Sequence, residues 1–186
     1  MLGWKKSHNT YYYGSNAYKY MDELIAKKGE ILIVSPYIDK YYADLILEKS
    51  RGSKFYVISS SIEARALEML SGKSGPLWAI GYLMLSAITL WLILSLGLRW
   101  PYLLISPVPL IIGVVKHLGK GSNVTLKIPR QFVHAKMYIS AGMAITGSAN
   151  LTYNGTHKNA EHINIIYDAQ DISRLKDQFW GIWGSI

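Results

Sequence analysis

Apolar residues in the first part of the chain alternate between helical and strand spacing. The period of about 3.6 residues in one segment and the short β-branched runs in the next predict helices and buried strands in turn. Gly and Pro end several of these segments. The expected elements are a helix that starts at Ser15 or Asn16 and stops at Gly29, a strand over 30–35, a helix from Asp39 to about Ser50, a strand over 54–59 and a short helix ending at Gly72.

The last third of the chain continues this pattern. We expect strands over 123–128, 132–141, 143–147 and 161–167, the middle two joined by an Ala-Gly turn, and a closing helix over 172–183 entered from Asp168 or Asp171. Strands that alternate with helices indicate an α/β fold with helices on both faces of the sheet.

Between these two parts, residues 77–98 form a run of 22 residues without a charge. As a helix this run would be about 33 Å long, and the hydrocarbon core of a bilayer is about 30 Å thick. A buried helix of a soluble protein rarely lacks a polar stripe over such a length. We therefore predict a transmembrane helix here.

A second apolar run covers 101–115 and contains Pro107 and Pro109. As a helix it would be only about 23 Å long, so a crossing needs tilt, a kink or a locally thinner bilayer. A re-entrant segment is the alternative. A full crossing would make residues 77–116 an inserted transmembrane helical hairpin, with the turn between the helices near residues 97–101.

Topology favours two crossings, because the segments on either side of the hairpin must join one sheet. Lys73, Lys116 and Lys120 flank the near side, whereas the far turn carries only Arg99. By the positive-inside bias, the part of the chain outside the hairpin should face the cytoplasm. The predicted location is therefore the cell membrane, as a two-span integral protein, with residues 1–76 and 117–186 forming one domain.

The composition adds a basic charge and excludes thiol chemistry. Twenty Lys and Arg residues against 12 Asp and Glu residues give a formal net charge of +8. This balance favours an anionic partner, and nucleic acid and an anionic lipid surface suit it equally well. The chain has no cysteine, which excludes disulfides, thiolate catalysis and cysteine-bound metals.

Three polar clusters in the last third of the chain carry the candidate chemistry. Their paired members are His134 with Lys136, Ser148 with Asn150, and Asn159 with Glu161. On an extended chain, side chains two residues apart point to the same face. The combined set suits a phosphodiester, with cationic and amide donors for the oxygens, a histidine for the phosphorus and a carboxylate to hold the histidine.

With these clusters, the chain resembles the phospholipase D superfamily, whose signature is His-x-Lys followed by Gly-Ser-x-Asn. The match consists of His134-Ala135-Lys136, then Gly147-Ser148-Ala149-Asn150, then Asn159-Ala160-Glu161. The strand that ends at Ser35-Pro36-Tyr37 is also typical of the family. The resemblance covers about residues 10–75 and 120–185, omits the hairpin, and implies a mixed β-sheet sandwiched by helices.

The resemblance also implies a mechanism. His134 would attack phosphorus and form a phosphohistidine, while a second histidine protonates the leaving oxygen. Lys136 and Asn150 would bind the non-bridging oxygens, Ser148 and Asn159 would complete the phosphate-binding set, and Glu161 would orient an imidazole. No metal and no cofactor is implied. Because members with a single signature resemble half an enzyme, we expect a homodimer whose two His134 side chains face each other.

Three functions remain open at this stage. The leading hypothesis is a membrane-embedded phosphodiesterase that hydrolyses or transfers a phospholipid headgroup, since the hairpin is inserted between the two halves of the domain. The second is a metal-independent endonuclease, which the net charge also suits. The third is a catalytically inactive membrane scaffold, because the aspartate of the family signature should fall near Ser140 or Ala141 and neither is acidic.

The remaining histidines and the tyrosine run are expected to be structural. No helical His-x-x-x-His motif or carboxylate cluster accompanies the histidines, so a metal site is not predicted. Tyr11, Tyr12 and Tyr13 are expected to cover an edge of the core, although stacking on bases or contact with lipid is an alternative. The histidines given a structural role are His8, His117, His157 and His162.

Overall fold

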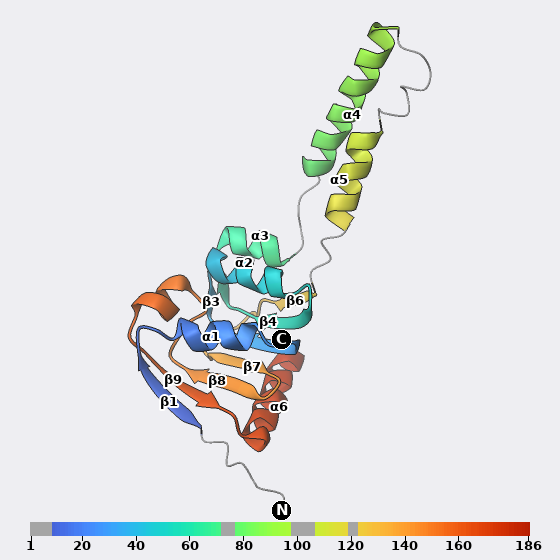
Figure 1. The fold of residues 1–186 in the computed structure, drawn as a ribbon. Helices are drawn as coiled ribbons and strands as arrows, with labels where there is room; N and C mark the ends of the chain where they lie inside the picture. The colour runs from blue at the N-terminus through green and yellow to red at the C-terminus, as the bar shows by residue number, and fades with distance from the viewer. Residues whose placement is uncertain (1–8, 72–76, 98–106, 119–122) are drawn as a thin grey trace, which may run out of the picture. The chain divides into compact units, whose positions relative to one another are not determined.

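The computed structural model describes residues 9–71, 77–97, 107–118 and 123–186 (Figure 1). The chain divides into two compact units. One unit combines residues 1–71 with 122–186, and the other covers residues 72–121.

The larger unit is built on a seven-stranded mixed sheet. Its strand order is β1-β9-β8-β7-β2-β4-β6. The pairs β2·β4 and β4·β6 are parallel, whereas the other four pairs are antiparallel. The strands are β1 (Thr10–Gly14), β2 (Gly29–Val34), β4 (Ser53–Ile58), β6 (Val124–Lys127), β7 (Met137–Ser140), β8 (Met143–Gly147) and β9 (Glu161–Ile166), and the short strands β3 (Tyr37–Ile38) and β5 (Ser61–Ile62) form a separate parallel pair.

Helices cover both faces of this sheet (Figure 1). Helices α1 (Tyr18–Ile25), α2 (Lys40–Lys49) and α3 (Ala64–Leu70) pack on one face, and α6 (Ala169–Ser185) packs on the other. Strand β2 contributes side chains to the hydrophobic cores on both faces of the sheet. Ile31 and Ile33 face the first three helices, and Leu32 and Val34 face α6. Side chains of a strand alternate between faces, so an unbroken apolar run suits a strand buried on both sides. The predicted mixed sheet with helices on both faces is confirmed.

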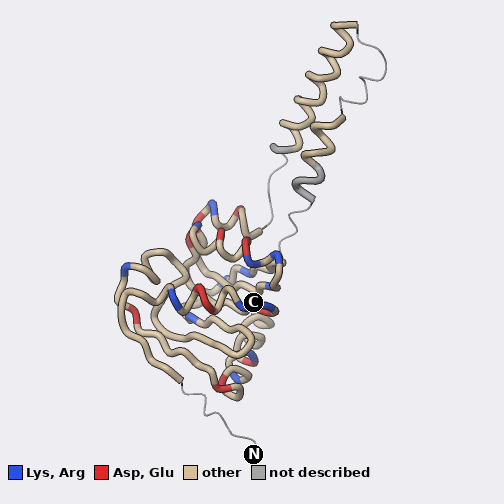
Figure 2. The backbone as a smooth tube through the Cα atoms, viewed as in Figure 1, with Lys and Arg blue, Asp and Glu red and all other residues tan. Residues whose placement is uncertain are grey.

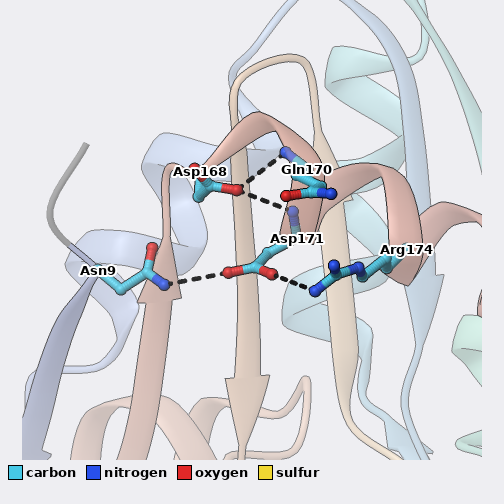
Figure 3. Close-up of polar contacts among 5 residues, drawn as sticks. All are labelled: Asn9, Asp168, Gln170, Asp171 and Arg174. Carbon is cyan, nitrogen blue, oxygen red and sulfur yellow. Dashed lines mark hydrogen bonds and ion pairs between the residues drawn. The ribbon is translucent and has the colours of Figure 1, made fainter. Parts of the chain in front are cut away.

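Aspartates begin two of these helices, as the sequence predicts. Asp39 accepts a hydrogen bond from the amide of Tyr42 (3.2 Å) at the start of α2. Asp168 accepts from the amides of Gln170 (2.9 Å) and Asp171 (3.0 Å) at the start of α6 (Figure 3). These bonds satisfy amides that have no partner within the first turn of a helix. Figure 3 also shows Asn9, just before β1, donating to Asp171 (3.4 Å).

Strand β1 lies at one edge of the sheet and was not predicted. Its central tyrosine, Tyr12, is half-buried and contacts Tyr20 at a ring-centroid distance of 5.3 Å. Tyr11 and Tyr13 project to the other side and are 70% and 75% exposed. Tyr12 therefore packs against the core, and the rings of Tyr11 and Tyr13 are exposed to solvent at this edge of the sheet.

Strand β7 is shorter than predicted. The sequence indicates a strand over 132–141, but β7 begins only at Met137. His134 and Lys136 thus precede the strand, and the argument from strand alternation does not apply to this pair. The β7–β8 turn at Ala141 and Gly142 is where the sequence places it.

The smaller unit contains helices α4 (Leu77–Ser95) and α5 (Val108–Leu118). The helices contact each other closely, since a Cβ atom at Gly113 would collide with the ring of Tyr82. Helix α4 has no acidic or basic residue anywhere along its length, and none is coloured on the described part of α4 in Figure 2. The turn predicted near 97–101 falls largely outside the described residues.

The predicted membrane crossing is wrong. Within the described segments, no helix is both long enough and apolar enough to pass through a bilayer. The helices are shorter than the runs that predicted them: α4 has 19 residues and α5, which follows Pro107, has 11, or about 29 Å and 17 Å at the usual rise of a helix. The transmembrane hairpin and the two-span location in the cell membrane are both corrected by this finding.

Candidate active site

His134 lies on a segment without regular secondary structure that is hydrogen-bonded to the residues after β4. The segment joins β6 to β7. The hydroxyl of Ser60, just after β4, accepts a hydrogen bond from the amide of Val133 (2.7 Å) and donates to the carbonyl of the same residue (3.2 Å). These two bonds hold the residue before His134 as a strand partner would, although no strand forms here.

Lys136 and His134 converge at this point. The Nζ atom of Lys136 lies 3.5 Å from both ring nitrogens of His134 and donates to the His134 carbonyl at 3.0 Å. Burial lowers the pKa of Lys136, and the nearby carboxylate of Glu161 partly opposes this shift. The imidazole and the ammonium group therefore present their polar atoms to the same place.

Gly147 brings the end of β8 against β9. Its φ of +152° lies in a region that L side chains rarely adopt. A Cβ atom here would collide with the carbonyl oxygen of His162. This close approach allows the amide of Ser148 to donate to that same carbonyl (2.9 Å). The glycine of the signature is thus required by packing.

Ser148, Asn159 and Glu161 form one hydrogen-bonded group behind Gly147. The Ser148 hydroxyl donates to Oε2 of Glu161 and accepts from the amide of His162 (3.0 Å). Asn159 Nδ2 donates to Oε1 of Glu161 at 3.4 Å. Glu161 is 8% exposed, and its bonds within the described residues go to Ser148 and Asn159. Its role in orienting an imidazole stays a prediction.

Asn150 is presented by a loop that a buried tyrosine holds. The hydroxyl of Tyr138 donates to the carbonyl of Ala149 (2.8 Å), and the amide of Leu151 donates to the hydroxyl of Ser35 (3.0 Å). Burial raises the pKa of Tyr138, so its hydroxyl stays protonated as a donor. Among the described residues, the buried Oδ1 of Asn150 accepts no hydrogen bond, which leaves an unmet polar group beside the cavity.

A cavity of about 450 Å³ collects these groups. Its lining residues are His134, Ala135, Lys136, Gly147, Ser148 and Asn150. Asn159 and Glu161 do not line the cavity. Glu161 hydrogen-bonds Ser148, which does, and Asn159 hydrogen-bonds Glu161. All six residues singled out from the sequence are therefore brought together, four as lining and two as support.

Sequence reasoning missed the residues that position this group. Ser60 follows β4, and Ser35 follows β2, the adjacent parallel strand. Tyr138 reaches the loop from β7. A serine within two residues of the end of a buried strand is visible in both places, but its hydrogen-bond partner depends on which strands are neighbours.

The position of the missing aspartate lies away from the cavity. Ala141 and Gly142 form the turn between β7 and β8, whereas Lys136 and Gly147 lie at the other end of this hairpin. Lys136 and Ala141 are five residues apart along this strand, or about 17 Å at the usual rise of a strand. Ser140 is buried and donates to the carbonyl of Met143 (3.2 Å), a bond that helps to close the turn.

Part of the chain matches a known protein family. Residues 113–183 match the family model described as cardiolipin synthase, PLD-like domain. The matched segment contains every candidate residue around the cavity. This match supports the resemblance to the phospholipase D superfamily that the signature indicates. Comparison with curated protein sequences gives no match.

Solved structures of low sequence identity are similar to this chain in fold. NucT from Helicobacter pylori has a TM-score of 0.56 at 14% identity, with 96% of each chain covered. Nuc from Salmonella typhimurium, a phospholipase D family member, has a TM-score of 0.51 at 15% identity, with 95% of each chain covered. The archaeal chromatin protein TrmBL2 has a TM-score of 0.51 at 15% identity, where 98% of this chain covers 54% of the other.

The family match and the grouped residues support an activity of the phosphodiesterase or phosphotransferase kind. No cluster of three His, Asp or Glu side chains that could hold a metal ion occurs in the part of the chain that the structure describes.

Proposed function

We propose that this protein is a phosphodiesterase that works through a phosphohistidine at His134 and completes its site with a second copy of the chain. The observation that carries the proposal is the convergence of His134, Lys136, Ser148 and Asn150 on one cavity. A nucleophile, a cation and amide or hydroxyl donors are the groups that a phosphoryl centre requires.

In the first step, a ring nitrogen of His134 attacks phosphorus, and a nitrogen–phosphorus bond forms as the bond to the leaving oxygen breaks. The leaving oxygen takes a proton from His134 of the second copy. Lys136 and Asn150 donate to the non-bridging oxygens as their charge develops.

In the second step, water or an alcohol attacks phosphorus, the nitrogen–phosphorus bond breaks, and the attacking oxygen gives its proton to the histidine of the second copy. Water gives hydrolysis, and an alcohol gives group transfer. The proposal of a second copy rests on the count of histidines: the chain carries one His-x-Lys motif, and the two steps require a nucleophile and a separate acid.

The substrate we propose first is a phospholipid headgroup. The supporting observation is the family model, whose description names cardiolipin synthase and whose matched residues include the whole candidate site. Headgroup hydrolysis and transfer share the phosphohistidine, so both reactions belong to this proposal.

Nucleic acid is the second candidate, and a different observation favours it. Tyr37 and Phe132 are 44% and 51% exposed and lie 5.9 Å apart between ring centroids, and Phe132 lies 6.2 Å from the ring of His134. Exposed rings beside a phosphate site can stack on bases. The net charge of +8 also suits a phosphate backbone.

One paired assay separates these substrates. The purified protein is given phospholipids of defined headgroup in liposomes or detergent micelles and, separately, single- and double-stranded DNA, each with and without EDTA. We expect EDTA-resistant release of headgroup, and a loss of about a thousandfold or more in His134→Ala. His162→Ala, which changes a histidine outside the cavity, serves as the matched control and should stay active.

The outcomes are distinct. Cleavage of DNA without headgroup release would make the protein an endonuclease of the same superfamily. Equal turnover by the wild type and His134→Ala would contradict the phosphohistidine. A well-folded protein with no turnover on either substrate would favour the inactive scaffold.

A further inference from the structure

The turn between Asn150 and Asn159 contains an aromatic cluster that the proposed chemistry does not use. The turn is η2 (Asn154–Lys158), a single π-helical turn. It connects the residue that lines the cavity to the asparagine that bonds Glu161. The central ring of this aromatic cluster belongs to His157, which was expected from the sequence to be only structural.

His157 lies between two tyrosine rings. Its ring stacks on Tyr18 of α1 at 4.4 Å with an interplanar angle of 8°, and on Tyr153 at 4.3 Å and 15°. Tyr41 of α2 meets it edge-on at 5.3 Å. Aromatic pairs at such distances contribute beyond their buried area. One imidazole thus joins η2 to two helices of the domain.

A hydrogen bond fixes the orientation of the His157 ring. Its Nδ1 atom lies 2.9 Å from Oγ1 of Thr156. The same Oγ1 lies within hydrogen-bond distance of the Thr152 carbonyl (3.0 Å) and of the Tyr42 hydroxyl (2.9 Å). The ring is therefore held in orientation as well as in position.

The same turn presses directly on the backbone of Asn150. A Cβ atom at Gly155 would lie 2.8 Å from the carbonyl oxygen of Asn150 and 3.3 Å from its nitrogen. Only glycine allows this approach without displacing a neighbour. The position of η2 therefore sets the position of the Asn150 backbone.

Two further bonds attach the loop to α2. The amide of Tyr153 donates to Oδ2 of Asp39 (2.5 Å), the residue that caps α2. The buried Thr156 receives the hydroxyl of Tyr42 from the same helix. The loop is thus held on one side by α1 and α2, and it holds the candidate site on the other.

We propose that His157 is a positioning residue for the phosphate-binding side of the cavity. Clamped between Tyr18 and Tyr153, it holds η2 against Asn150 and fixes the path of the chain to Asn159. This inference rests on the proposed phosphodiesterase function. His157 does not line the cavity, but the geometry of the phosphate-binding residues depends on it.

The experiment compares three variants with one matched control. His157→Phe keeps a stacking ring and removes the hydrogen bond of Nδ1, whereas His157→Asn keeps a hydrogen-bonding side chain and removes the stack. Gly155→Ala leaves the cluster intact and pushes on Asn150. His162→Phe is the control, because His162 also stacks on a tyrosine, Tyr11, at 6.2 Å.

Each folded variant is measured in two ways: kcat and KM on the substrate that the wild type turns over, and the Kd of inorganic phosphate. We expect His157→Phe and Gly155→Ala to weaken phosphate binding and lower kcat/KM by about tenfold or more, since displacements of about 1 Å in a site can cost a hundredfold. His157→Asn should fall between these and the wild type, and the control should match the wild type in both measurements.

A wild-type Kd for phosphate and an unchanged kcat/KM in both His157→Phe and Gly155→Ala would overturn the proposal. Lower thermal stability with those two constants unchanged would also overturn it, since it would reduce His157 to a structural role. Failure of the proposed function would give another result. His134→Ala would then keep its turnover, while the phosphate Kd of the His157 and Gly155 variants would still test the positioning role of His157.

Discussion

At the scale of single residues, two serines at the ends of neighbouring parallel strands hold the two parts of the cavity. Ser35 follows β2 and binds the amide of Leu151, next to Asn150. Ser60 follows β4 and binds Val133, next to His134. The ends of β2 and β4 are adjacent in the sheet, so the spacing between these parts depends on the sheet itself.

Ser60→Ala should therefore reduce both stability and activity. The amide and the carbonyl of Val133 would lose their partner, at a cost of about 1–3 kcal/mol, and His134 would be free to shift. Urea denaturation and kcat/KM measure the two effects. Ser61→Ala, one residue further along on an exposed position, is the matched control; a Ser60→Ala variant that equals it in both measurements would contradict this role.

Lys136 gives a prediction about pH. A lysine is charged only below its pKa, and burial lowers the pKa of Lys136 from the ordinary 10.5. Phosphate binding should therefore begin to weaken at a lower pH than for an ordinary lysine, as the ammonium group loses its proton. Phosphate Kd measured against pH tests this, with Lys136→Arg as comparison because an arginine stays charged to above about pH 12. A profile that is the same in both proteins would contradict the assignment.

The candidate residues could be found from sequence because they form a short linear signature. The residues that position them could not. Ser60 and Val133 are 73 positions apart, and Tyr138 meets Ser35 across 103 positions. Such contacts depend on the order of the strands, which local spacing does not contain.

At the scale of elements, the β7–β8 hairpin places the position expected for the signature aspartate at the end away from the cavity. The turn at Ala141 and Gly142 closes one end, and Lys136 and Gly147 lie at the other. Local patterns predicted this turn, most strands and the cap at Asp39 correctly. They missed β1, whose run of tyrosines does not alternate in polarity, and they extended β7 through a segment that Ser60 holds instead.

Ala141→Asp, which restores an acid at the position expected from the family signature, should therefore leave activity unchanged. Ala141 is exposed, so the added carboxylate stays in solvent and about 17 Å from Lys136 along the strand. We expect kcat/KM within about twofold of the wild type, given the weak effect of exposed charges at that range. A tenfold gain would show that the missing aspartate limits the enzyme.

At the scale of the whole molecule, the uncharged run in the middle of the sequence led to the largest error. Apolar length alone predicted a span, but the helices that form are shorter than the run, and none among the described residues can cross a membrane. The packing of helices on both faces of the mixed sheet was predicted correctly from the alternation of helices and strands along the chain. Periodicity is a reliable guide to faces and a poor one to where a helix ends.

The proposed pairing of two chains predicts a nonlinear loss of activity on mixing. If each site needs His134 from both copies, only about one quarter of the dimers in an equal mixture of wild type and His134→Ala hold two histidines. Co-refolded mixtures should then show about 25% of wild-type activity rather than 50%. Activity measured across a series of mixing ratios checks this, and a linear dependence would mean that each chain carries a complete site.

The most direct measurement is to trap the covalent intermediate. The protein is quenched during turnover, digested under conditions that preserve phosphoramidate bonds, and analysed by mass spectrometry. We predict a substrate-derived phosphoryl group on the peptide that contains His134, and its absence in His134→Ala. Active turnover with no modification of His134 would contradict the account.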